Sequence, residues 1–182
     1  LVDNTPPVVS SVVLSDNVTQ NNTNVSVTVN VSDASSGVVT VTADGTSLSD
    51  QGSNIWNGTV LLTSPSSNVT VVATDNASNS VTDNGTSYTI DDVAPVVNSV
   101  VLSDSYVNNN TNVTVTVNVS DANTSVVSVT ADGTSLSDQG SNIWNGTVLL
   151  TSPSGNVTVV ATDDADRKST RLNSRHSSVS RM

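Results

Sequence analysis

A near-identical repeat, 88 residues apart, limits the fold more than any other feature of this sequence. Residues 41–66 recur without a change as residues 129–154, and a match with substitutions covers residues 7–77 of the first copy. A repeat of this length corresponds to one small β domain, because propeller blades and solenoid coils are much shorter. The sequence therefore predicts consecutive domains of one fold.

The repeat and its proline pairs predict four segments. Residues 1–4 align with the end of the first copy, so we expect them to end a preceding copy. Residues 5–92 form the first copy, residues 93–165 a truncated second copy, and residues 166–182 a separate tail. Pro6-Pro7 and Ala94-Pro95 mark the starts of the copies, where proline holds a linker extended.

Short apolar runs within each copy predict β strands. Residues 25–31 alternate strictly, which puts four valines on one face and polar side chains on the other. Trp56, Val60 and Leu62 likewise share a face. Turn residues separate runs at residues 8–14, 25–31, 38–43, around 48, 55–62, 68–74 and 80–90. Six to seven strands with one apolar face must pack as two layers, so we predict an all-β sandwich.

Charge is divided unevenly along the chain. The 182 residues include 16 acidic residues, all Asp, and 5 basic residues, for a formal net charge of -11. All bases lie at position 167 or later, so residues 1–165 carry fifteen Asp and no base. Such a chain repels nucleic acid, and without cysteine it forms no disulfide. No apolar run is long enough to cross a membrane.

The residue types that perform acid, base or nucleophilic chemistry are scarce. Residues 1–165 contain no His, Cys, Lys, Arg or Glu. The pairs Asp91-Asp92 and Asp163-Asp164 could act as glycosidase carboxylates, but adjacent residues in a linker are more often simply solvated. We therefore predict that the protein is not an enzyme.

Several motifs together carry a family resemblance over residues 3–165. They are "V-x-V-T-V-x-V-S-D", "V-T-A-D-G-T-S-L", "I-W-N-G-T-V" and "V-T-V-V-A-T-D-N-A-S-N". In this order they resemble the Ig-like tandem repeats of large bacterial and archaeal cell-surface and S-layer-associated proteins. The resemblance implies Ig-like sandwich domains that serve mostly as spacers. The family usually has a glycine where this chain has Ser78.

The tail resembles something else. Ten of the eleven positions from Asp166 to His176 match DRKSTRLNSSH, the conceptual translation of a common sequencing adapter, and Arg175 departs from it. A natural basic tail is the alternative. The match begins where the 88-residue register ends, so we expect the second copy to lack its last strand. Residues 166–182 are then expected to be disordered or poorly packed.

Calcium is the one cofactor that the sequence suggests. Asp75 and Asn76, together with Asp91 and Asp92 of the linker, supply hard oxygen ligands near a domain end. Calcium there would stiffen an array and offset its self-repulsion. No calcium loop of fixed spacing is present, and no other cofactor is predicted.

Asn-x-Ser/Thr sequons are the most frequent motif. A polar strand face that alternates Val with Asn and Thr produces such sequons without any glycosylation. Asn30 and Asn57 lie opposite the valine stripe and Trp56, so we expect them and their counterparts Asn118 and Asn145 to be exposed and able to carry a glycan.

Aromatic residues suggest a core anchor and a binding candidate. Trp56 and Trp144 could stack on sugars, but one Trp in each sandwich more often anchors the core. Tyr106 lies where the two copies differ, which makes it the candidate for ligand binding.

The leading functional prediction is a non-catalytic spacer or stalk of a secreted or surface-anchored, extracellular protein, with neighbouring repeats as its partners. The alternative is an adhesion module that binds a glycan or a surface protein.

Overall fold

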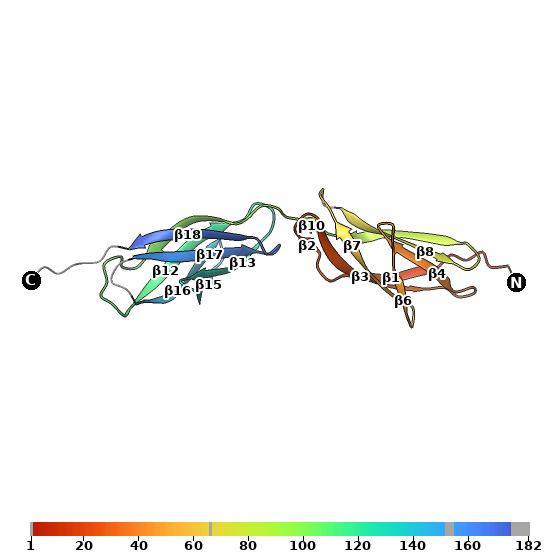
Figure 1. The fold of residues 1–182 in the computed structure, drawn as a ribbon, viewed down its shortest axis with the longest axis horizontal. Coiled ribbons are helices and arrows are strands. Elements are labelled where there is room, and N and C mark those ends of the chain that lie inside the picture. Colours follow the sequence, from red (N-terminus) through yellow and green to blue (C-terminus); the bar gives the residue numbers. More distant parts are fainter. Residues whose placement is uncertain (1, 66, 152–154, 176–182) are drawn as a thin grey trace, which may run out of the picture. The chain divides into compact units, whose positions relative to one another are not determined.

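A computed structural model describes residues 2–65, 67–151 and 155–175 (Figure 1). The chain divides into two compact units, Leu1–Asp91 and Asp92–Met182. None of the described segments forms an apolar helix of membrane-spanning length. Every regular element in the described part of the chain is a β strand, as the composition predicts.

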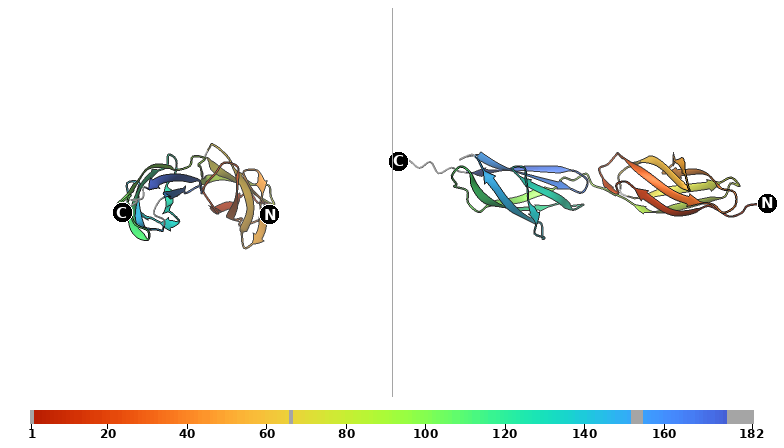
Figure 2. Two further views of the ribbon diagram at one scale, coloured as in Figure 1. Left: turned by 60° about the vertical axis from the view of Figure 1, so that its left-hand side comes forward. Right: turned by 90° about the horizontal axis from the view of Figure 1, so that it is seen from below.

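The first unit contains ten strands. They are β1 (Val8–Leu14), β2 (Val18–Thr19), β3 (Thr23–Ser32), β4 (Val38–Ala43), β5 (Thr46–Ser47), β6 (Ser49–Gly52), β7 (Ile55–Leu62), β8 (Asn68–Asp75), β9 (Ser80–Ser87) and β10 (Thr89–Ile90). One antiparallel sheet has the order β1-β3-β7-β6 and the other has the order β5-β4-β8-β9. The short strands β2 and β10 pair in parallel. Figures 1 and 2 show the two sheets of this unit as layers of a sandwich.

The core of the first unit lies between the sheets. It forms because apolar and polar side chains alternate along the strands, so that one face of each sheet is apolar. Val27, Val29 and Val31 of β3 are fully buried, as the strict alternation predicts. Trp56 is 8% exposed and belongs to the same hydrophobic cluster, so the prediction that it anchors the core is confirmed. Strand β8 contributes Val71 from the opposite sheet. Valine is the most frequent residue in this core, in line with a chain that contains no Phe.

Two tight turns depend on left-handed backbone conformations. Asp44 and Gly45 connect β4 to β5 with φ values of 46° and 77°, which is the geometry of a two-residue hairpin turn. Ser78 follows β8 with φ 69°. Since glycine adopts this conformation at no steric cost, the structure explains why similar repeats place glycine there.

The second unit contains eight strands, and none of its described residues forms a counterpart of β2 or β10. They are β11 (Val96–Leu102), β12 (Thr111–Ser120), β13 (Val126–Ala131), β14 (Thr134–Ser135), β15 (Ser137–Asp138), β16 (Ile143–Leu150), β17 (Gly155–Asp163) and β18 (Lys168–Arg175). Its sheets have the orders β11-β12-β16-β15 and β14-β13-β17-β18, which match those of the first unit. Trp144 is 8% exposed and lies in the core of this unit.

Strand β18 corrects the prediction that the second copy lacks its last strand. It pairs with β17 over eight residues, from Thr162↔Lys168 to Gly155↔Arg175. The prediction of disorder for residues 166–182 is therefore wrong for Lys168–Arg175, and residues 176–182 lie outside the described residues. Strand pairing uses backbone groups, which every residue except proline can supply, so an unrelated sequence of Ser, Thr and Asn can occupy the place of β9.

The side chains of β18 add little to the core. Leu172, its one large aliphatic residue, is 62% exposed. Arg171 instead covers β11, where its Nη1 donates hydrogen bonds to the carbonyl oxygens of Val97 and Asn98 at 2.9 and 2.7 Å. The backbone of β18 is thus fully paired with β17, but its described side chains make few buried apolar contacts. The prediction of poor packing holds in this respect.

Candidate metal centre

Three aspartates meet at one end of the first unit. Asp3 precedes β1, Asp33 follows β3 and Asp75 ends β8. One carboxylate oxygen from each residue takes part, and these three oxygens all lie within 4.8 Å of one another. Because β3 and β8 belong to different sheets, the three side chains connect both layers with the segment that enters the unit.

A turn holds Asp33 in place through its own carboxylate. Asp33 Oδ1 accepts hydrogen bonds from the amides of Ser35, Ser36 and Gly37 at 3.0, 2.8 and 2.9 Å. Aspartate favours such turns because its short side chain reaches the backbone amides that follow it. The second oxygen of this carboxylate takes no part in the turn.

Asp75 organises the neighbouring loop in a similar way. This residue is 1% exposed, and its Oδ1 accepts hydrogen bonds from the amides of Ala77 and Asn79, both at 2.8 Å. Asn79 Nδ2 donates to Asp75 Oδ2 at 2.8 Å and also to the carbonyl oxygens of Asp3 and Thr5. Asn79 therefore fastens the entering segment to the loop after β8.

The electrostatics of this cluster favour ionised carboxylates. Hydrogen bonds from the Ser36, Ser35 and Gly37 amides lower the pKa of Asp33, although the charge of Asp3 opposes that shift. Hydrogen bonds from Thr5 and Ser36 lower the pKa of Asp3. Two negative charges thus lie beside buried Asp75 in a unit whose sequence contains no base.

The lowered pKa of Asp33 predicts a defined pH dependence of stability. A carboxylate with a folded pKa below its unfolded value stabilises the fold above about pH 4, and this contribution is lost as the pH falls through the folded pKa. We expect Asp33→Asn to lower the melting temperature at pH 7 and to converge on the wild-type value near pH 2. A constant difference between the two proteins in melting curves over this range would contradict the prediction.

The structure separates the four predicted calcium ligands. Asp75 lies in the cluster, but Asn76 does not: its Nδ2 donates to the Ser36 carbonyl oxygen at 2.9 Å and so joins two loops. Asp91 is buried where the first unit ends, and its amide donates to the Thr19 carbonyl oxygen at 2.9 Å. Asp75 and Asp91 therefore lie at opposite ends of the first unit, as the positions of the N-terminal segment and β10 in Figure 1 indicate. Grouping Asp75 with Asp91 from sequence was wrong.

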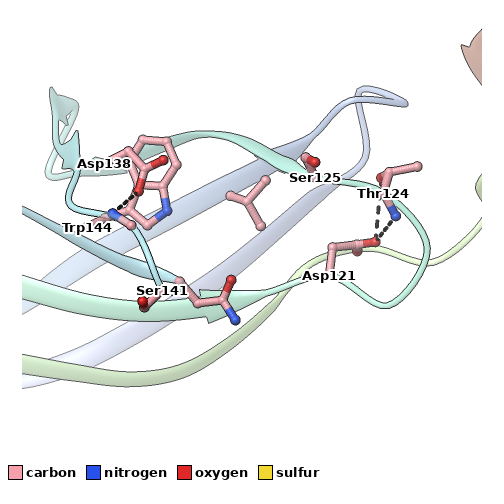
Figure 3. A pocket seen from close by; sticks show the side chains of 9 residues that line it. Asp121, Thr124, Ser125, Asp138, Ser141 and Trp144 are labelled. Atoms are coloured by element: carbon pink, nitrogen blue, oxygen red, sulfur yellow. Dashed lines mark hydrogen bonds between the residues drawn. The ribbon is translucent and has the colours of Figure 1, made fainter.

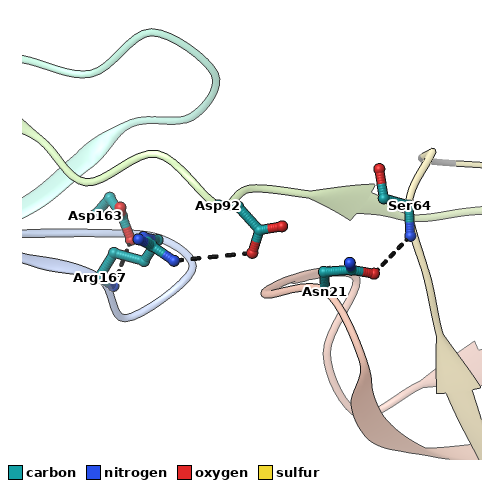
Figure 4. A network of polar contacts seen from close by, with 5 residues as sticks. All are labelled: Asn21, Ser64, Asp92, Asp163 and Arg167. Carbon is teal, nitrogen blue, oxygen red and sulfur yellow. Dashed lines mark hydrogen bonds and ion pairs between the residues drawn. The ribbon is translucent and has the colours of Figure 1, made fainter.

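Asp92 has a different partner. It belongs to the second unit, where its Oδ1 lies 3.8 Å from Nη1 of Arg167 (Figure 4). The same figure shows Asn21 of the first unit, whose Oδ1 accepts a hydrogen bond from the Ser64 amide at 2.8 Å. Asp92 thus forms an ion pair that only the basic tail makes available.

Sequence reasoning missed Asp3 and Asp33. The repeat contained the signal, because Asp91, Asp121 and Asp163 recur 88 residues after Asp3, Asp33 and Asp75. In the second unit Asp121 Oδ1 accepts the Thr124 amide at 2.9 Å, and Asp163 Oδ1 accepts the Arg167 amide at 2.8 Å. Arg167 occupies the position of Asn79, so the second unit carries a guanidinium group in a loop where the first has an amide.

A shallow groove lies beside the core Trp in each unit. In the second unit it has a volume of about 250 Å³, and Asp121, Asp138 and Trp144 are among the residues that line it (Figure 3). The counterpart in the first unit, of about 190 Å³, includes Asp33, Asp50 and Trp56. Each Trp is only 8% exposed, so neither ring offers an open face for stacking on a sugar.

The remaining candidates occupy strand faces and a loop. Asn57 is exposed, whereas Asn30, Asn118 and Asn145 are half-buried. These three side chains are less exposed than the alternation predicts. Glycosylation itself stays a prediction. Tyr106 is 57% exposed in the loop between β11 and β12.

Comparisons with known proteins identify the fold. No family model and no curated protein matches the chain. Fibronectin(III)-like modules of CbhA from Clostridium thermocellum match with a TM-score of 0.53 and 16% identity, over 94% of this chain and 97% of that one. The chain covers 66% of the Escherichia coli adhesin FdeC (TM-score 0.45, 12% identity, 94% of this chain) and 66% of an I-band fragment of titin (TM-score 0.48, 13% identity, 96% of this chain). Both units have an Ig-like fold. The Ig-like arrangement accounts for the matching strand orders, but at these identities it carries no ligand or partner.

Proposed function

We propose that this chain is part of a non-catalytic, load-bearing spacer in a secreted or surface-anchored protein. The observation that carries the proposal is the parallel pairing of β2 with β10 in the first unit. These strands lie near the two ends of the unit's chain and are neighbours in Figure 1. Two further hydrogen bonds, from the Thr89 amide to the Asn17 carbonyl oxygen and from the Asp91 amide to the Thr19 carbonyl oxygen, measure 2.7 and 2.9 Å.

Parallel pairing has a mechanical consequence. Tension enters β2 from its N-terminal side and leaves β10 at its C-terminal side, so the two strands are pulled past each other along their axes. Hydrogen bonds that lie across this direction are loaded together rather than one after another. A unit fastened in this way resists extension, which suits a stalk. The described residues of the second unit form no counterpart of this pair, so the proposal applies to the first unit.

The sequence supports the same role. Two copies that share an unchanged run of 26 residues, 41–66 and 129–154, suit a spacer, which needs copies rather than a unique site. The acidic, base-free surface of residues 1–165 suits an extracellular environment where salt screens charges within about 10 Å. Neighbouring repeats are its proposed partners.

Single-molecule pulling on the full chain tests this function. We expect two unfolding events, each releasing roughly 300 Å of extended chain at about 3.4 Å per residue. Thr89→Pro removes one amide donor from the β2/β10 region, and loss of a hydrogen bond of about 1 kcal/mol should speed unfolding of one unit by roughly fivefold. The second unit, which keeps its sequence, is the control in the same molecule. Equal unfolding rates with and without Thr89→Pro would contradict the proposal.

Adhesion is the second candidate, and the exposed ring of Tyr106 favours it. Tyr106 replaces Val18 of the first copy, so the loop differs where the rest of the repeat is uniform. Glycan-array binding by the full chain that disappears in Tyr106→Ala would establish adhesion. Binding to no glycan would leave the spacer as the better supported function.

A further inference from the structure

We propose that Asn84, in the edge strand β9, is a site of spontaneous deamidation. Asparagine is chemically labile where glycine follows it, because the unhindered amide nitrogen of the glycine can attack the side-chain carbonyl carbon. The chain contains three such pairs, Asn57-Gly58, Asn84-Gly85 and Asn145-Gly146. Their surroundings differ, and the pair in β9 has the backbone freedom that this approach needs. The inference does not rest on a spacer function.

The reaction needs the chain and water alone. The Gly85 amide nitrogen forms a bond to Cγ of Asn84, and the bond from Cγ to Nδ2 breaks. Nδ2 leaves as ammonia, with the proton that the Gly85 amide gives up. Water then opens the cyclic imide at either carbonyl group, which gives an aspartyl residue or an isoaspartyl linkage without oxidation or reduction. Ring closure within one chain is favoured because the reacting groups are already neighbours.

A β-bulge lies at this pair of residues. The register of β9 against β8 shifts here, so that Asn84 and Gly85 together face Thr70. The Gly85 amide donates to Asp83 Oδ1 at 3.3 Å. The Asn84 carbonyl oxygen accepts a hydrogen bond from Asn68 Nδ2 at 2.6 Å. Both residues of the pair are exposed, and β9 has one neighbour in its sheet. An exposed bulge on an edge strand opens at a small free-energy cost, so the backbone can rotate toward the ring geometry.

The other two pairs are held in inner strands. Asn57 of β7 pairs with β3 on one side and with β6 on the other. Asn145 of β16 pairs with β12 and β15 in the same way. Rotation of either backbone would break strand pairing on both sides, so we expect ring closure to be much slower there.

Glycine also has a different role in the two settings. A Cβ at Gly58 would lie 2.5 Å from Leu48 Cδ2, so the core of the first unit requires glycine at this position. At Gly85 the nearest atom to such a Cβ is Asp83 Oδ1, at the ordinary contact distance of 3.4 Å. Gly85→Ala should therefore fold as the wild type does, while its methyl group hinders attack by the amide nitrogen.

Conversion would change β9 in two ways. Either product adds a negative charge to a unit whose sequence contains no base, and the isoaspartyl linkage also inserts a methylene group into the backbone of the strand. The second copy has Leu172 at the equivalent position, so this change is specific to the first unit. The pairing of β8 with β9 should weaken, and the first unit should melt at a lower temperature as the protein ages.

Mass spectrometry of the aged full chain tests the site. Unglycosylated protein is used, because Asn84-Gly85-Thr86 is a sequon and a glycan on Nδ2 would block the leaving group. At pH 8, Asn84 should gain about 1 Da at a rate at least about tenfold higher than Asn57 and Asn145. Fragment ions of an isoaspartyl linkage should appear at position 84. The rate should be lower at pH 6, since ring closure requires loss of the Gly85 amide proton.

Gly85→Ala is the matched variant. Before ageing it should keep the wild-type melting temperature, and its rate of conversion at position 84 should be lower at least about tenfold. After ageing, the melting temperature of the first unit should fall in the wild type and stay unchanged in this variant. The proposal is overturned if Asn84 does not convert, if Asn57 or Asn145 converts as fast as Asn84, or if Gly85→Ala converts at the wild-type rate.

Discussion

Leu62→Ala should destabilise the first unit by about 2 to 5 kcal/mol. Leu62 is fully buried and is among the largest side chains in the core of the first unit. Truncation removes apolar contacts and leaves a cavity that close-packed valines cannot fill. Differential scanning calorimetry should show one of two overlapping transitions moving down by 10 °C or more, while the other stays in place.

The adjacent residue provides the control. Leu61 lies on the same strand but is 51% exposed, so Leu61→Ala should change stability by less than about 0.5 kcal/mol. Leu150→Ala, at the identical position of the second copy, should move the other transition instead. A single transition that shifts as a whole with either core variant would show that the units do not unfold independently.

Asp75→Ala should lower the free energy of unfolding of the first unit by about 3 kcal/mol. The substitution leaves two backbone donors, the amides of Ala77 and Asn79, without their acceptor, and removes one of the three acceptors of the Asn79 side-chain amide. Loss of a charged acceptor for several partly buried donors costs more than the repulsion that it relieves. Urea unfolding monitored by fluorescence in a Trp144→Phe background would measure the change, since the remaining Trp56 lies in the core of the same unit.

Asp75→Asn separates hydrogen bonding from charge. The amide oxygen can still accept hydrogen bonds from the two backbone amides, so we expect the free energy of unfolding to fall by about 1 kcal/mol or less. Should Asp75→Ala and Asp75→Asn prove equally stable, the loop would not depend on this acceptor.

The strands that sequence reasoning predicted well are those in which packing decides the conformation. Residues 25–31 alternate because one face is buried, and the structure extends this run only by a few residues to Thr23–Ser32. Strands β2 and β10 were not anticipated as separate elements. Each has two residues, too short for alternation, and their pairing is set by where the sandwich brings the ends of the chain together.

The aspartate cluster shows the same limit. Asp75 was identified from its residue type and its place near a domain end, but its partners come from 72 and 42 residues earlier in the chain, 75 − 3 and 75 − 33. Only the three-dimensional arrangement tells which end of the sandwich each aspartate occupies. The spacing within the repeat could have shown that all three recur, although not that they meet.

The exposed side chains of β18 have a consequence for assembly. A strand held at the edge of β17 mainly by backbone hydrogen bonds, with few apolar contacts of its own, is open to replacement by another strand of similar length. The donor could be the last strand of another molecule, so the second unit is suited to strand exchange between chains. A short peptide with the sequence of β9 would compete for the same edge, which makes this unit a natural acceptor for building chimeric arrays from interchangeable strands.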